Sequence, residues 1–338
     1  GAGPAAARAA LAPFAALYAG VVAARGWMYD HGLLPSHDLP IPSVSVGNLS
    51  VGGTGKTPLS AWIAAELRDL DAAPAIVLRR YGGDEPLVHS TLNPDVPVIV
   101  DADRVRGVNR AMVMGARSTV LDDAFQHRRA RRSADIVLLS ADRWQPRQRL
   151  LPAGPWREPV RALRRASLVI VTRKAAGEET AAVALRAALA AAPDVSGAVA
   201  LLALGKLHLA TGPGEQPLSR IEGADVLAVS AVGDPGAFAA QLRTAGAANV
   251  RTATFPDHHH FTGGDAAALA GAAAAADLAI CTLKDAVKLA PLWPRQAGPL
   301  WYVSQRVEIE RGQRDVDRLL HALAAAAAAR TATSRVTT

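Results

Sequence analysis

The sequence contains a single cysteine, Cys281, and few aromatic residues. One cysteine cannot form an internal disulfide, so we exclude a disulfide-stabilised secreted domain and expect a reducing, cytosolic environment. Aromatic residues make up only 4% of the chain. A basic nucleic-acid-binding ATPase would need aromatic stacking positions among its arginines. We therefore expect no nucleic-acid partner.

Lysine is also scarce, because only five of the 37 basic residues are lysines, at positions 56, 174, 206, 284 and 288. Arginine fills the other basic positions, so a lysine within a motif indicates that a compact ammonium is needed there. The hint is strongest for Lys56 and weaker for Lys284 and Lys288. The net charge of +7 is compatible with nucleic acid, an anionic membrane or a phosphorylated small substrate.

The apolar N-terminal segment, residues 5–29, has no long uncharged run, since Arg8, Pro13 and Arg25 interrupt it. Sixteen residues separate the two arginines, fewer than the about twenty that a spanning helix needs. No small-residue cleavage site follows, so a signal peptide is not expected either. Two interpretations stay open: a helix packed on the first domain, and a helix at an anionic membrane surface.

Short apolar runs alternate with helix-like segments along the 338 residues, half of which are hydrophobic. This alternation predicts an α/β fold: a P-loop NTPase-type domain with a mostly parallel sheet, followed by a second, smaller α/β domain. The expected units are an apolar helix (1–40), the P-loop domain (41–175), the second domain (176–310), and a helix with a frayed tail (311–338). Strands are expected at 41–46, 75–78, 96–100, 119–121, 136–139, 168–171, 198–204, 226–231, 250–255, 278–282 and 301–303.

A glycine-rich segment, VSVGNLSVGGTGKTP at residues 44–58, lies between an expected strand and an expected helix. Its glycines allow successive backbone N–H groups to surround a phosphate. Lys56 can reach the outer phosphates, and the Thr57 hydroxyl can bind Mg²⁺. The general pattern has glycine where this chain has Ser50, and a loop with only structural duties is the alternative. We predict that ATP is bound by Ser50, Gly52, Gly53, Thr54, Gly55, Lys56 and Thr57.

Two acidic pairs follow other expected strands, at Asp122–Asp123 and at Asp84–Glu85. A P-loop enzyme places its Mg²⁺-binding acid at the first of these positions, and adjacent carboxylates favour a nearby cation. The alternative for Asp122–Asp123 is to cap the following turn. Asp84 is a candidate to accept a hydroxyl proton, because loops at the carboxyl ends of parallel strands converge. A simple turn at GGDEP is equally compatible with the sequence.

Three consecutive histidines, residues 258–260, follow Asp257 in the second half. Neighbouring residues of a strand point to opposite sides, which disfavours a zinc site made by all three. A single histidine held by a carboxylate and serving proton transfer is the preferred interpretation. A GTPase is disfavoured, because the nearest base-recognition segment, TLKD at 282–285, has the wrong spacing.

Eight motifs occur in an order that resembles the tetraacyldisaccharide 4′-kinases, the lipid A kinases. They are VSVGNLSVGGTGKTP, RRYGG, GDEP, VLDDAFQHRR, DIVLL, LLPAGPWREP, FPDHHHF and TLKDAVK. The resemblance extends from about Arg25 to Lys288. It implies transfer of the γ-phosphoryl group of ATP, with Mg²⁺, to the 4′-hydroxyl of a tetraacylated glucosamine disaccharide 1-phosphate. It also implies a peripheral enzyme on the cytoplasmic face of the inner membrane that forms lipid IVA.

The resemblance also implies roles for individual residues. Asp84 would activate the acceptor hydroxyl, and His258 would orient Asp84 or share its proton. Lys56 would be the third catalytic residue. The implied Mg²⁺ ligands are Thr57, Glu85, Asp122 and Asp123. The chain departs from the family pattern between its Tyr-Gly-Gly and Gly-Asp-Glu-Pro turns, which are fused here and share Gly83. Contacts with the base and the affinity for ATP are therefore the least transferable expectations.

Overall fold

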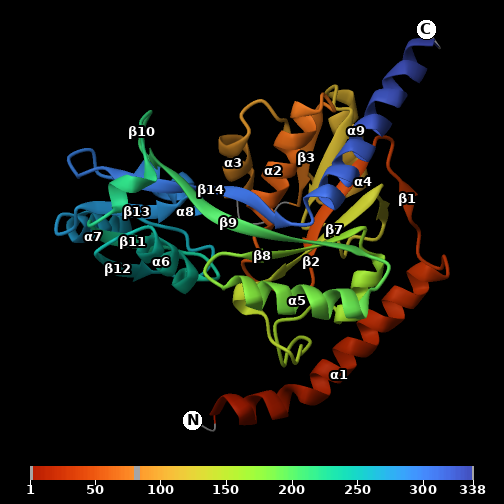
Figure 1. Ribbon diagram of the computed structural model, residues 1–338, viewed down its shortest axis with the longest axis horizontal. Helices are drawn as coiled ribbons and strands as arrows, with labels where there is room; N and C mark the ends of the chain where they lie inside the picture. The colour runs from red at the N-terminus through yellow and green to blue at the C-terminus, as the bar shows by residue number, and fades with distance from the viewer. Residues whose placement is uncertain (1–2, 80–83, 337–338) are drawn as a thin grey trace.

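A twelve-stranded sheet crosses the computed structural model, which describes residues 3–79 and 84–336 (Figure 1). The strands are β1 (His37–Asp38), β2 (Ser43–Asn48), β3 (Pro74–Leu78), β4 (Val98–Val100), β5 (Ser118–Asp122), β6 (Ala130–Arg131), β7 (Ala134–Ser140), β8 (Leu168–Arg173), β9 (Ser196–Leu209), β10 (Glu215–Gln216), β11 (Asp225–Ser230), β12 (Asn249–Thr254), β13 (Leu278–Thr282) and β14 (Leu300–Arg311). The order in the twelve-stranded sheet is β12-β11-β13-β14-β9-β8-β7-β2-β5-β3-β4, with β10 beside β9, and β1 and β6 form a separate two-stranded sheet. Only β9 pairs antiparallel, with β14 and β10, so the predicted mostly parallel α/β sheet is confirmed.

Helices cover both faces of this sheet (Figure 1). They are α1 (Gly3–Asp30), α2 (Lys56–Asp69), α3 (Glu85–Leu92), α4 (Arg104–Val113), α5 (Glu178–Ala191), α6 (Pro235–Thr244), α7 (Gly263–Ala273), α8 (Leu283–Leu289) and α9 (Gln313–Val336). Four 3₁₀ turns accompany them among the described residues: η1 (Ala141–Arg143), η2 (Val160–Arg165), η3 (Leu218–Ile221) and η4 (Ala290–Leu292). In the first half, α2 and α9 pack on one face, and α4 and α5 pack on the other.

The central strand β2 is buried on both faces, as its β-branched sequence predicts. It lies between β5 and β7, so the loop that follows it emerges at the carboxyl edge of the sheet beside the end of β5. The apolar residues Leu59, Ile63 and Leu67 recur along α2 and are fully buried, which fixes this helix against the sheet. The topology therefore delivers the glycine-rich loop and the Asp122–Asp123 pair to one place.

Several expectations need correction. Strands β9 and β14 continue well beyond 198–204 and 301–303, because they pair with each other along most of their lengths. Residues 85–92 form helix α3, for which no element was expected. The tail expected to be frayed from Thr331 is helical as far as Val336. The division at residue 176 stays a prediction, and the sheet crosses it through the parallel pairing of β8 with β9.

The N-terminal helix α1 is continuous through Pro13 and Arg25, and it lies along the outside of the molecule (Figure 1). By length and composition alone, its segment Ala10–Asp30 could cross a membrane, although the arginines led us to expect otherwise. None of that segment's apolar window is buried. Helix α1 is therefore not a core helix, although polar contacts connect it to residues of the first domain.

Candidate functional site

The glycine-rich loop joins β2 to α2 and adopts a backbone that requires glycine at two positions. Gly52 and Gly55 have φ values of 102° and 82°. A Cβ atom at Gly52 would lie 1.8 Å from Nη1 of Arg143, and one at Gly55 would lie 2.4 Å from Cδ1 of Leu202. The left-handed backbone therefore disfavours larger residues at both positions, and a Cβ atom would also displace the ends of these two side chains. The loop ends directly on the N-terminus of α2, where backbone N–H groups favour anions.

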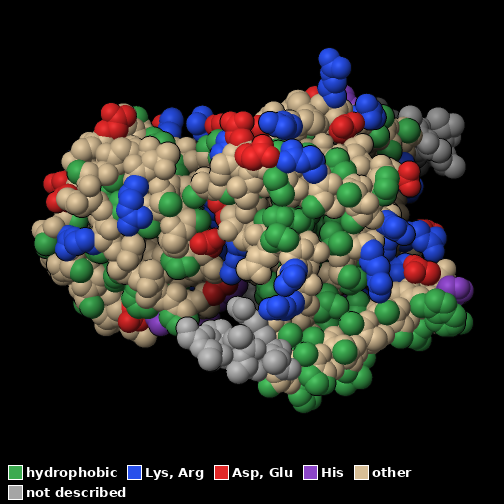
Figure 2. All heavy atoms as spheres, turned by 60° about the horizontal axis from the view of Figure 1, so that its bottom comes forward, with side chains coloured by type: hydrophobic (Ala, Val, Ile, Leu, Met, Phe, Trp, Pro, Cys, Tyr) green, Lys and Arg blue, Asp and Glu red, His purple; other side chains and the backbone are tan. Residues whose placement is uncertain are grey.

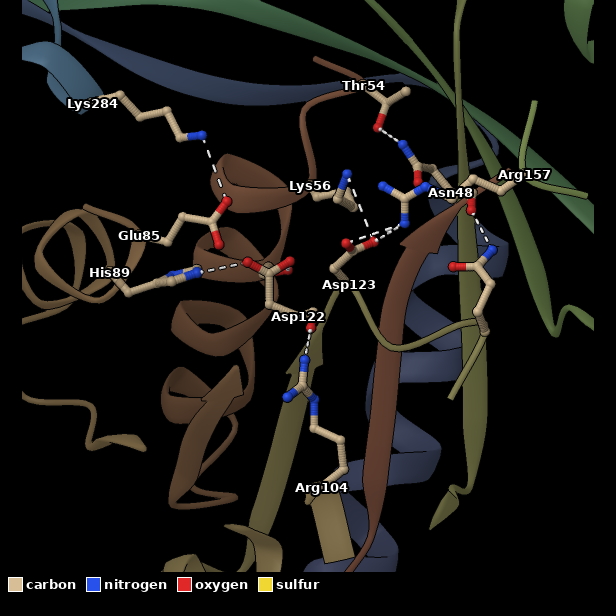
Figure 3. Close-up of polar contacts among 12 residues, drawn as sticks. Asn48, Thr54, Lys56, Glu85, His89, Arg104, Asp122, Asp123, Arg157 and Lys284 are labelled. Atoms are coloured by element: carbon tan, nitrogen blue, oxygen red, sulfur yellow. Dashed lines mark hydrogen bonds and ion pairs between the residues drawn. The ribbon is translucent and has the colours of Figure 1, made fainter. Parts of the chain in front are cut away.

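Hydrogen bonds to Thr54 fix the position of this loop, and the bond from Asn48 is drawn in Figure 3. Asn48 Nδ2 donates to Thr54 Oγ1 at 2.7 Å, and Thr172 Oγ1 donates to the Thr54 carbonyl at 2.9 Å. The Thr54 side chain is buried in these contacts. Ser50 pairs with Trp156 and lines a separate cavity of about 320 Å³.

A large cavity of about 1170 Å³ opens beside the loop, between the two halves of the chain. Most of the predicted site residues line it: Gly52, Gly53, Thr54, Gly55, Lys56, Thr57, Glu85, Asp122, Asp123 and His258. Ser50 does not line this cavity. Asp84 lies behind its wall, in contact with His258. Residues 80–83, which include the fused turn and Gly83, lie outside the described residues.

Asp122, at the end of β5, is buried and fully paired (Figure 3). Its carboxylate accepts hydrogen bonds from Ser60 Oγ and from Nε2 of His89, each at 3.0 Å. Burial alone would raise the pKa of Asp122, but the hydrogen bond and charge of His89, helped by Lys56 and Ser60, outweigh burial and lower it. Arg104 donates to the Asp122 backbone carbonyl at 3.0 Å. The carboxylate is therefore held ionised in a fixed position.

The neighbouring Asp123 is more exposed and faces the phosphate loop (Figure 3). Its φ of 48° turns it away from the strand direction. Arg157 Nη1 donates to its carboxylate oxygens at 3.1 and 3.2 Å, and Nζ of Lys56 lies 3.8 Å away. Thus Asp123 connects the loop lysine to Arg157, whose motif the sequence identified without a role.

Glu85 is the first residue of α3 and contributes a third carboxylate to the cavity. Burial, followed by the negative charge of Asp122, raises its pKa. Lys284 from the opposite half lies 3.6 Å from it and opposes this effect. Glu85 is therefore paired across the cavity with a cation of the opposite half.

Asp84 caps the N-terminus of α3, where its carboxylate accepts the backbone N–H of Glu85 at 3.1 Å. Its other oxygen, Oδ2, lies 3.4 Å from Nδ1 of His258 and 3.8 Å from Nζ of Lys288. Only 3% of Asp84 is exposed. His258 has a φ of 60°, so the backbone of the histidine segment is turned to aim this side chain at α3.

The donor set suits Mg²⁺ bound with a phosphate. Thr57, Glu85, Asp122 and Asp123 offer only oxygen atoms, which Mg²⁺ prefers. Burial and then the charge of Asp122 raise the pKa of Glu85, and a bound cation would favour its ionised form. Within residues 3–79 and 84–336, no group of three His, Cys, Asp or Glu side chains is arranged to hold a metal alone. Mg²⁺ bound by one or two carboxylates and substrate phosphates does not need such a group.

Three functional contacts were not predicted from the sequence. His89 was not singled out, because a lone histidine inside an apolar helix has no motif around it. Asn48 lies within the loop motif, but the motif alone assigns it no role. The scarcity of lysine drew attention to Lys284 and Lys288, yet their carboxylate partners on α3 became visible only in the structure.

Comparisons with known proteins agree with this geometry. A family model described as tetraacyldisaccharide-1-P 4′-kinase matches residues 7–325. The tetraacyldisaccharide 4′-kinase of Halorhodospira halophila is 38% identical, over 90% of this chain and 89% of that protein. The protein of the same name from Syntrophus aciditrophicus is 35% identical, over 88% of each chain.

Among solved structures, the "apo" form of LpxK from Aquifex aeolicus in complex with ATP matches with a TM-score of 0.71 and 28% identity. The match covers 94% of this chain and 99% of that one. The phosphate loop, the buried acids and the order of the motifs lead to the same family as these matches. The chain belongs to the tetraacyldisaccharide 4′-kinase family.

Proposed function

We propose that this chain transfers the γ-phosphoryl group of ATP to the 4′-hydroxyl of tetraacyldisaccharide 1-phosphate, forming lipid IVA in lipid A synthesis. Family membership and the ATP complex of the Aquifex aeolicus relative support the reaction. The observation that carries the proposal is the single cavity in which the Lys56 loop and the buried Asp122 face His258 from the opposite half. A phosphate donor and a hydroxyl acceptor can meet there.

The phosphate side of the reaction depends on the loop. Backbone N–H groups of the glycines and of the α2 N-terminus bind the phosphates, and the Lys56 ammonium neutralises their oxygens. Thr57, Glu85, Asp122 and Asp123 would hold Mg²⁺, which when bound neutralises charge on the phosphates. Such fixed charges are effective because they do not reorganise during the reaction.

The acceptor side depends on Asp84 and His258. Because Asp84 is buried behind the cavity lining, a shift between the halves must first bring it to the acceptor. Asp84 then accepts the proton of the attacking 4′-hydroxyl while that oxygen bonds to the γ-phosphorus and the bond to the β-phosphate oxygen breaks, releasing ADP. His258, 3.4 Å from Asp84, orients the carboxylate or shares its proton. A positioned base of this kind contributes about 10²–10⁴-fold to the rate.

The wall formed by α1 suits an acylated substrate. Tyr18, Val21, Val22, Arg25 and Gly26 line the same cavity as the phosphate loop. The Tyr18 hydroxyl donates to the Arg157 carbonyl at 3.0 Å, which ties α1 to the site. A sugar in the cavity could therefore extend its acyl chains along an apolar helix.

We further infer that α1 lies at an anionic membrane surface, which makes the enzyme a peripheral protein of the cytoplasmic face of the inner membrane. Figure 2 shows hydrophobic side chains gathered at the lower right, where α1 lies, with basic side chains nearby. Phe14, Leu17 and Val21 are each more than half exposed. An exposed apolar helix flanked by cations favours the boundary of anionic headgroups. That nucleic acid is not a partner stays a prediction.

The test of the reaction is transfer of labelled phosphate from ATP to the disaccharide 1-phosphate, with the position of the new phosphate determined on the product. We expect label at the 4′-oxygen. Acceleration of ATP turnover by nucleic acid instead of the disaccharide, or phosphate at another hydroxyl, would contradict the proposal.

The test of the membrane contact is co-flotation of the purified chain with anionic vesicles, comparing wild type with Leu17→Glu. Burial of one leucine contributes about 1.5–3 kcal/mol, so this change should weaken vesicle binding at least tenfold. Val113→Glu on α4 is the matched control, because Val113 is 83% exposed and lies outside α1. Equal binding of all three proteins would contradict a role for α1.

A further inference from the structure

Lys288 is the second basic side chain close to Asp84, after His258, and the reaction described above gives it no role. It lies on α8, and its Nζ is 3.8 Å from Asp84 Oδ2. Nine-tenths or more of the Asp84 carboxylate is buried, and its Oδ2 has no hydrogen-bond donor within the described residues. Because a buried carboxylate is unstable without a nearby positive charge, the ammonium of Lys288 is an important neighbour of the base.

The ammonium has two other partners, both from its own half. It lies 3.6 Å from Asp285 Oδ1 and donates to the His259 carbonyl at 3.2 Å. Its side chain is only 14% exposed, and Nζ lies 5.4 Å from the centre of the Phe261 ring. One N–H donor of the ammonium is used by the His259 carbonyl, and the oxygens of Asp84 and Asp285 lie at ion-pair distance from the same nitrogen.

Asp285 anchors this arrangement to the loop that carries the histidine. It is fully buried and accepts the Ala231 N–H at 3.1 Å and the Thr282 hydroxyl at 2.7 Å. The carbonyl of the same Ala231 accepts the backbone N–H of His258 at 3.3 Å. A closed circuit of contacts therefore runs from Asp84 through Lys288, Asp285 and Ala231 to His258, and back to Asp84.

We infer that Lys288 is a positioning residue for phosphoryl transfer: its ammonium bridges the buried Asp84 and Asp285 and holds the Asp84 carboxylate against His258. The inference rests on the proposed function of Asp84 as the base. It explains why a chain that otherwise uses arginine has lysine at this position. The planar guanidinium of arginine presents its donors in one plane and cannot reproduce a compact three-way contact.

The experiment compares Lys288→Met, Lys288→Arg and the control Lys206→Met in the transfer assay. Lys206 is an exposed lysine on β9 that pairs with Glu215, outside the cavity. We expect Lys288→Met to lower kcat about 10²-fold, as small misplacement of a reacting group does, with the KM for ATP within about twofold of wild type. Lys288→Arg should recover little of this loss, and Lys206→Met should match wild type.

The same substitution in the Asp84→Asn background separates positioning from general stability. If Lys288 acts through Asp84, adding Lys288→Met to Asp84→Asn should lower kcat no further. An equal loss in both backgrounds, or an unchanged kcat in the single variant, would overturn the inference. If Lys288→Met does not fold, Lys288→Gln replaces it, because glutamine keeps an N–H donor while removing the positive charge. Its kcat is then compared in the wild-type and Asp84→Asn backgrounds.

A crystal structure of Lys288→Met gives a readout that does not depend on activity. We expect the Asp84 carboxylate to turn away from His258, whereas a carboxylate that keeps its wild-type separation of 3.4 Å would refute the positioning role. A wild-type protein that fails to phosphorylate the disaccharide would instead count against the proposed function. The two failures are therefore distinguishable.

Discussion

On the phosphate-loop side of the cavity, the buried Asp122 takes its partners, Ser60 and His89, from its own half of the chain. On the opposite side, each of the two lysines of α8 also pairs with a carboxylate of the other half. Lys284 reaches Glu85, and Lys288 reaches Asp84. The contacts of Asp122 are thus complete within one half, whereas the ion pairs of Glu85 and Asp84 depend on packing of α8 against α3.

This difference separates two duties of the site. The nucleotide side is held in place by contacts that do not require the second half, so its residues should control ATP binding and stability. The acceptor side is formed by contacts between the halves, so its residues should control transfer while ATP affinity stays nearly constant. Closure or small shifts between the halves would then regulate the chemical step without releasing the nucleotide.

The largest effect is expected on the acceptor side, from Asp84→Ala. Loss of the base should lower kcat about 10²–10⁴-fold with little change in ATP affinity. The measurement is steady-state transfer combined with direct titration of ATP. Asp95→Ala, at an exposed position after α3, is the control. Unchanged turnover in Asp84→Ala would remove the base assignment and with it the contrast between the two walls.

On the nucleotide side, Lys56→Met should affect both binding and turnover. The loop lysine neutralises phosphate oxygens in the bound and reacting states, so ATP affinity should fall and kcat should drop about 10²–10³-fold. Lys56→Arg should not restore activity, because the narrow loop suits a compact ammonium. ATP titration and transfer rates measure the two effects. Normal ATP affinity in Lys56→Met would show that the loop does not hold the phosphates.

Much of the fold could be predicted because each half repeats a simple pattern. Apolar strand segments alternate with helical ones, and the buried strands β2, β5 and β8 lie close to their expected positions. The lengths of β9 and β14 could not be predicted, because their extra residues are stabilised by each other across a large sequence separation. Pairing between distant segments leaves little trace in local periodicity.

The site could be predicted where a motif has a fixed local geometry. The glycines of the loop and the acids after β5 line the cavity as the spacing suggests. Ser50 was assigned to ATP through its place in the motif, yet its neighbours in the structure are Trp156 and a separate cavity. The sequence did not predict that His89 is a hydrogen-bond donor to Asp122, because His89 lies on helix α3, far from β5 in the sequence. Such contacts are properties of tertiary packing.

On the nucleotide side, removing the hydrogen bond between His89 and Asp122 should lower the free energy of unfolding. His89→Leu keeps an apolar side chain of similar size but removes the donor to Asp122, leaving a buried carboxylate less compensated. We expect a loss of about 3 kcal/mol in the free energy of unfolding, measured by urea denaturation. His321→Leu, at an exposed position of α9, should change stability little. Equal stability of both variants would show that Asp122 does not depend on His89.

The smallest effect is a difference in pH dependence between Asp122 and Asp285. The pKa of Asp122 is lowered despite burial, mainly by His89, whereas burial raises the pKa of Asp285 against the hydrogen bonds of Thr282 and Ala231. Asp122 therefore stabilises the folded chain above its ordinary pKa of 3.8, and this contribution is lost as the pH falls through its lower folded value. Asp285 instead opposes folding above its raised pKa, and that penalty disappears as the pH falls to 3.8.

Urea unfolding of Asp122→Asn and Asp285→Asn, without Mg²⁺ and between pH 7 and about 3, should reveal opposite trends. The Asp122→Asn protein should be less stable than wild type at pH 7 and approach it only below pH 3.8, because the ionised carboxylate is what folding favours. For Asp285→Asn, removing the charge offsets the lost contact with Lys288, so its deficit should be smaller at pH 7 and grow as wild type becomes protonated. If the free energy of unfolding changed with pH in the same way for both variants, the two carboxylates would have pKa values shifted in the same direction. The two sides of the cavity would then not differ in how they stabilise a buried carboxylate.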